Sequence, residues 1–327
     1  MDNFSYRRAL SHQEALGALQ EQDGSKLLAG GTDLIPLMKE GIWSPDRLID
    51  ITAIPDCDAV EAREDGLNIG ALVPLSTLAS HPAIQQSYTA LSDACRLAAT
   101  PQLRNMGTIG GNLLQQTRCW YYRGPYDCWL KGGDVCYARG GENEYHSIFA
   151  TSPEESRCVS AHPSDPAAAL LALDASVTFQ TAQGETELPI EELYALPKES
   201  RRSFVTLPHE AVLTGIRLPA AATAGISAYD KAMARASWAF ALAGVAIYFE
   251  KQGGEISRAR IALSGVAPIP TRARKVEAQL EGADLANLEL DTLAETLVES
   301  ARPLSHNGYK VKLLRALFKQ TLSRILE

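Results

Sequence analysis

The stretch Thr108-Ile109-Gly110-Gly111-Asn112 opens a long segment that closes on His162-Pro163-Ser164-Asp165. The segment between them has little apolar periodicity and is rich in Gly, Tyr, Trp and charge. It carries most of the cysteines of the chain: Cys119, Cys128, Cys136 and Cys158. Irregular segments of this length inside a compact domain are usually either functional or disordered, and clustered thiols and aromatic rings argue against disorder. The segment therefore predicts a phosphate-binding turn followed by a metal-binding loop, with the rest of the chain as scaffold.

Composition excludes several classes of protein. A chain of 327 residues suggests about two domains, and 46% hydrophobic residues are enough for a substantial core. The net charge of -8 argues against a nucleic-acid-binding protein, which usually has a basic face. The N-terminus lacks the apolar core of a signal peptide, and no apolar run reaches membrane-spanning length. We therefore expect a cytoplasmic protein without nucleic-acid or membrane partners, whose cysteines bind metal or fill the core.

Hydrophobic periodicity and capping signals predict the elements around this segment. The first part begins with a helix that the capping box Ser11-x-x-Glu14 starts. A strand at 26–29, a helix from residue 34 and a strand at 47–51 then form a β-loop-α-β unit. Next we expect a strand at 67–72, a helix at 88–99, a helix begun by Asp165, a hairpin of 177–180 with 187–190 and a strand at 212–218. After an alanine-rich linker at 220–224 come strands at 227–233, 242–250 and 256–264, then helices near 272–280, 290–301 and 309–325. Strands followed by helices indicate an α+β fold.

Two glycine-rich turns have the chemistry of an anion site. The first glycine turn, Ala29-Gly30-Gly31-Thr32-Asp33-Leu34, lies where a strand passes into a helix. Glycines let the backbone approach a ligand, and free amides at a helix start favour a diphosphate. It is neither a Rossmann fingerprint nor a P-loop, and alone it would be an ordinary turn. The second glycine turn, residues 108–112, offers similar chemistry, so the two could hold one pyrophosphate from both sides.

These turns, together with His162-Pro163-Ser164-Asp165, resemble the FAD-binding medium subunit of the molybdenum hydroxylases. That family includes xanthine dehydrogenases, aldehyde oxidoreductases, carbon monoxide dehydrogenase and 4-hydroxybenzoyl-CoA reductase. The motifs occur in order and the resemblance covers nearly the whole chain. It implies an α+β fold with an FAD-binding domain of the vanillyl-alcohol oxidase (PCMH) class at 1–219, in subdomains of about 1–55 and 56–219. It also implies a C-terminal domain at 220–327 with a three-stranded sheet and helices.

The resemblance assigns cofactor contacts residue by residue. The first glycine turn and the strand before it would wrap the FAD pyrophosphate, and the second would hold its other side. Asp165 would accept a hydrogen bond from the cofactor, and Lys231 would lie near the flavin ring, although a solvent-exposed strand lysine is the alternative. Ala99 and Leu213 match contact positions by alignment only. The full set of expected FAD contacts is Leu27, Leu28, Ala29, Gly30, Gly31, Thr32, Asp33, Leu34, Ala99, Thr108, Ile109, Gly110, Gly111, Asn112, Asp165, Leu213 and Lys231.

The spacing of Cys119, Cys128, Cys136 and Cys158 contains no C-x-x-C pair, so it leaves a four-cysteine zinc site and a [4Fe–4S] cluster both open. Inert cysteines are a third interpretation, which four thiols in one aperiodic loop disfavour. The family sharpens the choice, because a subset resembles this chain from Thr117-Arg118-Cys119 to Cys158-x-x-x-His162-Pro163. In that subset the loop at 113–161, here called the cysteine loop, binds a [4Fe–4S] cluster. Cys57 and Cys95 are expected to be structural.

No arrangement of histidines, carboxylates or hydroxyls suggests acid–base or nucleophilic catalysis, so we predict no catalytic residues in this chain. The resemblance implies an electron-transfer subunit of a heterotrimer, with a large molybdopterin-binding subunit, a small [2Fe–2S] subunit and an external electron carrier as partners. Two alternatives stay open. One is a self-sufficient FAD oxidase with a structural zinc site, and the other is a metal-stabilised interaction module without a redox role.

Overall fold

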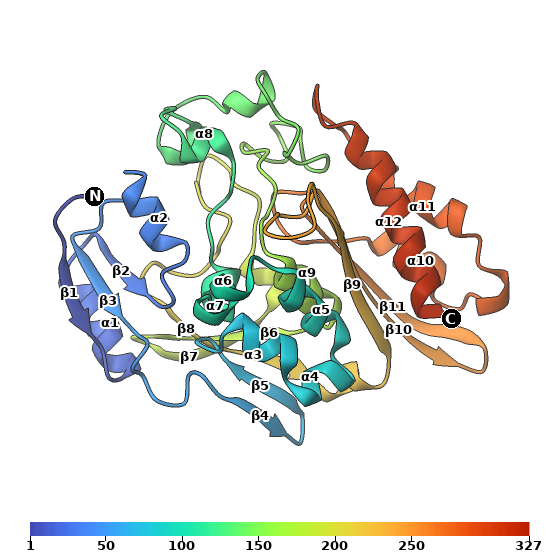
Figure 1. The fold of residues 1–327 in the computed structure, drawn as a ribbon, viewed down its shortest axis with the longest axis horizontal. Helices are drawn as coiled ribbons and strands as arrows, with labels where there is room; N and C mark the ends of the chain where they lie inside the picture. The colour runs from blue at the N-terminus through green and yellow to red at the C-terminus, as the bar shows by residue number, and fades with distance from the viewer. Residues whose placement is uncertain (327) are drawn as a thin grey trace.

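A computed structural model describes residues 1–326, which form three sheets with helices around them (Figure 1). The N-terminal sheet has the order β1-β3-β2 and is parallel: β1 Ser5–Arg8, β2 Ser25–Leu28 and β3 Arg47–Asp50. Helices α1 (His12–Glu21) and α2 (Leu34–Lys39) connect these strands. The predicted β-loop-α-β unit and the Ser11 cap of α1 are confirmed. Strand β1 was not predicted, because all its residues are exposed and show no apolar alternation.

A five-stranded antiparallel sheet forms the middle of the molecule, in the order β4-β5-β8-β6-β7. Its strands are β4 Val60–Arg63, β5 Gly66–Gly70, β6 Ser176–Thr181, β7 Gly184–Pro189 and β8 Val212–Pro219. The predicted hairpin corresponds to β6 and β7 and is confirmed. Strands β4 and β5 precede the long irregular segment and the other three follow it, so the segment leaves and re-enters one sheet domain.

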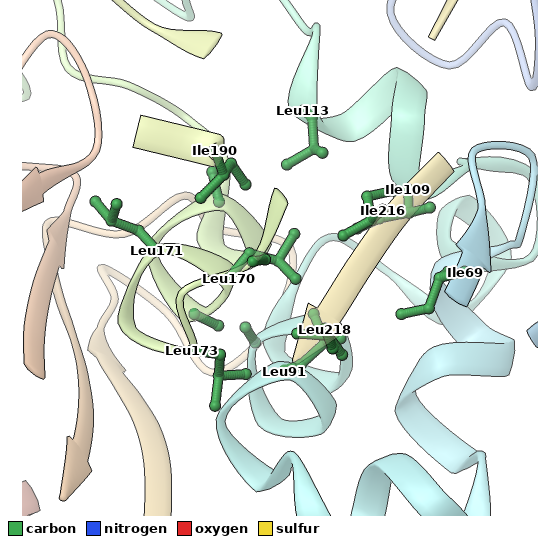
Figure 2. Packing of buried hydrophobic residues seen from close by; sticks show 14 of the residues in the cluster. Ile69, Leu91, Ile109, Leu113, Leu170, Leu171, Leu173, Ile190, Ile216 and Leu218 are labelled. Carbon is green, nitrogen blue, oxygen red and sulfur yellow. The ribbon is translucent and has the colours of Figure 1, made fainter. Parts of the chain in front are cut away.

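The helices around this sheet are α3 Leu75–Ser80, α4 Pro82–Ser87, α5 Thr89–Leu97, α6 Pro101–Met106, α7 Ile109–Leu113 and α9 Asp165–Ala172. Ile109 and Leu113 of α7 are fully buried in the same core as Leu91 and Leu170 (Figure 2). The second glycine turn is therefore anchored by apolar packing on both sides. One prediction was wrong in detail, since the side chain that caps α9 is Ser164, and Asp165 is the first helical residue.

The C-terminal part follows the predicted order of strands and then helices. Its antiparallel sheet has the order β12-β11-β10-β9: β9 Ile226–Ala232, β10 Ala243–Gln252, β11 Glu255–Ser264 and β12 Thr271–Arg272. The expected sheet of three strands therefore has four, because β12 is two residues long and too short to show a pattern. Helices α10 (Arg274–Leu280), α11 (Leu290–Val298) and α12 (Tyr309–Leu326) follow. Within the described residues, no helix combines the length and apolar composition needed to cross a membrane.

Alternation along β10 explains how the parts pack together. Val245, Ile247 and Phe249 face the core under α10, α11 and α12. Ala246 and Tyr248 face the opposite core, shared with α5 and α9. Period-2 alternation with both faces apolar is typical of a sheet covered on both sides. Helices α5 and α9 thus lie between the middle sheet and the C-terminal sheet.

The cysteine loop is largely irregular, as predicted, with only the short helix α8 (Trp120–Arg123) and two 3-10 turns (Trp129–Lys131 and Tyr137–Arg139). Three further 3-10 turns lie outside it: Ile190–Leu193, Ala220–Thr223 and Leu285–Asn287. In Figure 1 the loop lies between α2 on the N-terminal side and α12 on the C-terminal side. The loop contacts the N-terminal part at Asp33, the middle part at Pro197 and the C-terminal part at Asn307.

The packing of α12 gives a first prediction. Phe318 is fully buried in the core under the C-terminal sheet. Phe318→Ala should lower the free energy of unfolding by about 3–5 kcal/mol, because it removes apolar contacts and leaves a cavity. Its neighbour Lys319 forms a surface ion pair with Asp291, so Lys319→Ala should change it by about 0–1 kcal/mol. Urea unfolding of both variants measures the difference, and equal losses would contradict this packing.

Candidate functional site

The first glycine turn presents a row of unpaired backbone donors. It follows β2 and leads into α2, and Gly31 has a φ of 70°, which favours glycine. The amides of residues 30–34 donate to no acceptor within residues 1–326. These residues line a groove of about 230 Å³, here called the nucleotide compartment. Consecutive free N–H groups at the start of a helix suit a phosphate or diphosphate.

The two glycine turns are in direct backbone contact. A Cβ atom on Gly30 would lie 1.7 Å from the carbonyl oxygen of Met106, the last residue of α6 and two residues before the second turn. A Cβ atom on Gly110 would lie 2.9 Å from the Cβ of Ala71. Both positions therefore require glycine because neighbouring chain occupies the space of a side chain. The structure thus brings together two turns that are far apart in the sequence, and both line the nucleotide compartment.

The second glycine turn differs from the expectation that both turns offer free amides. The amide of Ile109 donates to Val73 O at 2.9 Å, and that of Gly110 donates to Ala71 O at 2.8 Å. The Gly111 amide donates to the side-chain oxygen of Thr108 at 3.1 Å, as in a helix N-cap. The second turn therefore supplies a rigid wall, one hydroxyl and the amide of Thr108, whereas most of the free donors come from the first turn.

A second compartment of about 360 Å³, here called the ring compartment, continues the groove and shares Thr32, Asp33, Thr108, Gly111 and Gln115 with the first. Leu27 and Leu213 line the nucleotide compartment, and Ala99, Asn112, Asp165 and Lys231 line the ring compartment. Ile109 is fully buried in the core and lines neither compartment, and Leu28 also lines neither. Most predicted contact residues thus surround one continuous groove. Lys26 and Trp43 also line it and were not predicted.

A buried ion pair lies at the wall of the ring compartment. Lys231 Nζ is 2.7 Å from Asp165 Oδ2, and the two side chains are only 1% and 5% exposed. The hydroxyl of Tyr229 donates to the other carboxylate oxygen at 2.6 Å. Lys231 is therefore not a solvent-exposed strand lysine. Tyr229 was not predicted from the sequence. It lies two positions before Lys231 on β9, and residues two apart on a strand point to the same face.

Asp33 connects the first glycine turn to the cysteine loop. Its side chain does not cap α2. Instead, Asp33 Oδ1 pairs with Arg118 at 2.8 Å and with Arg123 at 2.7 Å. Asp33 Oδ2 accepts the amide of Gln116 at 2.8 Å. The carboxylate is thus used to fix the beginning of the loop, while the Asp33 amide remains among the free donors of the groove.

The two ends of the cysteine loop are held together, because Ser164 Oγ donates to Asn112 Oδ1 at 2.5 Å. Further along, the loop is fixed to the C-terminal part. Asn307 Nδ2 donates to the carbonyls of His146 at 3.1 Å and Ser147 at 3.0 Å. Lys310 Nζ donates to Tyr145 O at 3.0 Å and is fully buried. The cysteine loop is therefore fixed by hydrogen bonds at both ends and along its length, and it begins and ends beside the groove.

The four cysteines of the loop line one small cavity of about 20 Å³, here called the cysteine cavity. Tyr121, Tyr122 and Trp129 complete its wall. Within residues 1–326, no three of these sulfur atoms lie within 4.8 Å of one another. Tetrahedral zinc with Zn–S bonds of about 2.3 Å holds its thiolates about 3.8 Å apart. No three of the sulfur atoms are therefore placed to bind one zinc ion without movement of the loop.

Burial governs the electrostatics of this cavity. It raises the pKa of Cys119 to about 12, with a smaller contribution from Cys136 and Cys128, and it also raises the pKa of Cys158. A bound cation reverses this preference, since a coordinating thiol is deprotonated outright. His146 Nε2 is 3.2 Å from Cys119 Sγ. The sequence suggested no partner for this histidine, and only the folded loop brings the two together.

Comparisons with known proteins agree with the groove. Residues 2–221 match the family described as the FAD binding domain in molybdopterin dehydrogenase. Residues 227–325 match the CO dehydrogenase flavoprotein C-terminal domain. The chain belongs to the FAD-binding medium-subunit family of the molybdenum hydroxylases. The expected fold class is confirmed by the same findings.

Relatives of this medium-subunit family match along their whole length. The aldehyde oxidoreductase FAD-binding subunit PaoB of Escherichia coli K12 is 36% identical, over 100% of this chain and 98% of its own. The carbon monoxide dehydrogenase medium chain of Hydrogenophaga pseudoflava is 27% identical, over 98% and 96%. A solved structure of carbon monoxide dehydrogenase from the same organism superposes with a TM-score of 0.78, covering 99% of this chain and 97% of that chain.

The groove offers backbone hydrogen-bond donors that suit the diphosphate of FAD. The free amides of residues 30–34 could hold the diphosphate, and Gly30 and Gly110 keep the backbone close enough. Gly30→Ala should push the turns apart, because its Cβ would overlap Met106 O. We expect most bound flavin to be lost, as measured by absorbance of the purified chain. Gly17→Ala, where a Cβ meets nothing within 4 Å, should retain flavin. Full flavin content in Gly30→Ala would contradict this geometry.

Lys310 gives a pH-dependent prediction for the attachment of the loop. Burial lowers the pKa of Lys310 to about 7, below its ordinary value. Between that folded pKa and the ordinary value near 10.4, the unfolded chain binds more protons than the folded chain, so stability rises with pH. Wild type should therefore gain stability relative to Lys310→Met between about pH 7 and pH 9, by at most about 1.4 kcal/mol per pH unit. Urea unfolding at several pH values measures this, and parallel pH profiles would contradict it.

Proposed function

We propose that this chain is the FAD- and [4Fe–4S]-containing electron-transfer subunit of a molybdenum-hydroxylase-type oxidoreductase. The observation that carries the proposal is the adjacency of two sites. The Asp33 carboxylate, at the start of the flavin groove, pairs with Arg118, and the next residue is the first cysteine of the cysteine cavity. On this proposal, one chain would provide neighbouring sites for two redox centres.

The residues of the groove would have distinct roles toward FAD. The amides of the first glycine turn would hold the diphosphate, and Ala99, Asn112 and Asp165 would border the ring system. Lys231, fixed by Asp165 and Tyr229, would place a cation beside the ring and favour electron density there. When bound, FAD supplies redox chemistry that exchanges electrons singly or in pairs.

The residues of the cysteine loop fit an iron–sulfur cluster. Cys119, Cys128, Cys136 and Cys158 would each supply one thiolate, which is the usual ligand set. The aromatic wall would exclude water, and the His146 ring beside Cys119 could donate a hydrogen bond to the ligand sulfur. Such outer contacts tune the potential of a metal centre. The sulfur spacing argues against the alternative of a self-sufficient FAD oxidase with a structural zinc.

We further propose that the chain functions in the cytoplasm with a large molybdopterin-binding subunit, a small [2Fe–2S] subunit and an external electron carrier. Support comes from the relatives, which are described as a FAD-binding subunit and a medium chain and which this chain matches over their full length. We also propose that the domain division falls at residues 219 and 220, between the end of β8 and the C-terminal sheet.

Metal analysis and flavin content test the proposal on the purified chain. We expect FAD and about four iron atoms per chain, with a broad visible absorbance that dithionite bleaches. Cys158→Ser should remove the iron and leave FAD bound, because Cys158 lines the cysteine cavity and not the flavin groove. Cys95→Ser is the matched control, since Cys95 is buried in the core away from that cavity.

Two outcomes would contradict the proposal. Zinc in place of iron would favour the alternative oxidase, which would also turn over without partner subunits. A chain that binds metal but no flavin after refolding with both, and that is insensitive to Gly111→Val, would indicate the metal-stabilised interaction module.

A further inference from the structure

A third cavity of about 650 Å³ adjoins the two redox sites and has no role in the function proposed above. It is here called the aromatic cavity. Three segments form it: residues 118–120 with 145–146 of the cysteine loop, residues 161–163 before α9, and residues 234–242 between β9 and β10. Its volume lies in the range of small-molecule sites, about 300–1,000 Å³.

The walls of the aromatic cavity are flat apolar rings. Trp120 and Tyr145 stand on the side of the cysteine loop, with ring centroids 5.5 Å apart. Trp238 and Phe240 stand on the other side and are 60% and 51% exposed. Large rings left exposed on two facing segments are typical of a binding site, and their faces suit a planar aromatic ligand.

The charge of the aromatic cavity is opposite to that of the whole protein. Its lining includes the guanidinium groups of Arg118 and Arg235 and no carboxylate, although the chain carries a net charge of -8. Arg118 is already paired with Asp33. The Arg235 guanidinium carbon lies 5.0 Å from the centre of the Trp238 ring, and Nε and one terminal nitrogen donate to Trp238 O at 3.0 and 2.7 Å. Its other terminal nitrogen donates to no acceptor among residues 1–326. The lining therefore favours an anionic ligand and leaves Arg235 to meet it.

The aromatic cavity also touches both redox sites. It shares Pro163 and Trp238 with the ring compartment. The guanidinium of Arg118, 5.0 Å from the centre of the Phe240 ring, forms part of the partition between the two spaces. Cys119 lines both the aromatic cavity and the cysteine cavity. A molecule bound here would thus lie against the flavin compartment on one side and a proposed cluster ligand on the other.

We propose that the aromatic cavity binds the external electron carrier, and that this carrier is a planar anionic aromatic molecule of the quinone class. The electron transfer rests on the function proposed above, whereas the binding itself rests only on the cavity. A quinone takes up two electrons and two protons at its carbonyl oxygens and becomes a quinol. When bound, the reduced flavin would supply both electrons and both protons and would be reoxidised in the same step.

Anthraquinone-2-sulfonate is a suitable probe, because it is planar and anionic and has no free quinone carbon that thiols attack. Its uncharged counterpart is 2-(hydroxymethyl)anthraquinone. Equilibrium dialysis against the oxidised purified chain gives the Kd of each, and steady-state assays of the assembled holoenzyme give kcat and KM for each as oxidant. We expect tighter binding and a lower KM for the sulfonate.

Two variants separate the contributions of charge and stacking. Arg235→Gln should weaken binding of the sulfonate about three- to tenfold and leave the uncharged analogue unchanged, because it removes one partly screened charge. Arg235→Lys should restore part of the loss. Tyr145→Ala should weaken both ligands, since it removes a ring face that contacts either one. Arg63→Gln, which removes an exposed guanidinium on β4, is the matched control and should change neither.

The proposal is overturned if Arg235→Gln and Tyr145→Ala both leave the Kd and KM of the sulfonate unchanged. It is also overturned if the isolated chain binds the probe and the holoenzyme does not, because a partner segment then fills the cavity. FAD and iron contents of the same samples test the proposed function separately. A sample without flavin that still binds the probe in an Arg235-dependent way would contradict the electron-transfer function and leave the binding site standing.

Discussion

The backbone contact between Gly30 and Met106 is the constraint on which the site depends. It joins the turn after a parallel strand of the N-terminal sheet to the end of α6, two residues before the turn that begins α7 on the middle sheet. Each turn is rigid for its own reason, since the first ends a strand and the second is fixed in the core through Ile109 and Leu113. A groove between two such elements keeps its width without help from a ligand. The free amides then point into a space whose opposite wall cannot move, which is the preorganisation that anion binding requires.

The cysteine loop begins and ends next to the second glycine turn, which forms one wall of this groove. It leaves at Asn112 and returns at Ser164, and a hydrogen bond joins these two residues. A loop whose ends are already together has little closure entropy left to lose when it orders. The remaining order comes from Asp33 at its beginning and from Asn307 and Lys310 in the C-terminal part. Sulfur positions set by three separate regions of the chain are also the reason that spacing in the sequence could not distinguish zinc from a cluster.

The sequence predicted the features that depend on local chemistry. The glycine turns, the Ser11 cap, the β6–β7 hairpin and the order of the C-terminal elements all carry short-range signals, and the structure contains them. It did not predict β1 or β12, because an exposed four-residue strand and a two-residue strand carry no pattern. It also could not show that the amides of the second turn are used by Val73 and Ala71, since those acceptors come from another part of the chain. For the same reason, His146 became a site residue only once tertiary contacts were known, whereas Tyr229 lies on the same face of β9 as Lys231 and could have been predicted from that spacing.

The buried charges of this molecule are better explained by how they orient site residues than by what they add to the free energy of unfolding. The Asp165–Lys231 pair is almost fully removed from water, and the cost of desolvating two ions commonly equals or exceeds their attraction. An apolar pair of similar volume would hold the core at least as well. The pair instead places a cation on the wall of the ring compartment, with Tyr229 and the carbonyl of Ala239 fixing its direction. Asp33 acts similarly, because its two arginines orient the first residues of the cysteine loop toward the groove. Buried polar groups in this protein thus determine where redox groups could lie relative to one another, while apolar packing supplies the stability that makes this arrangement possible.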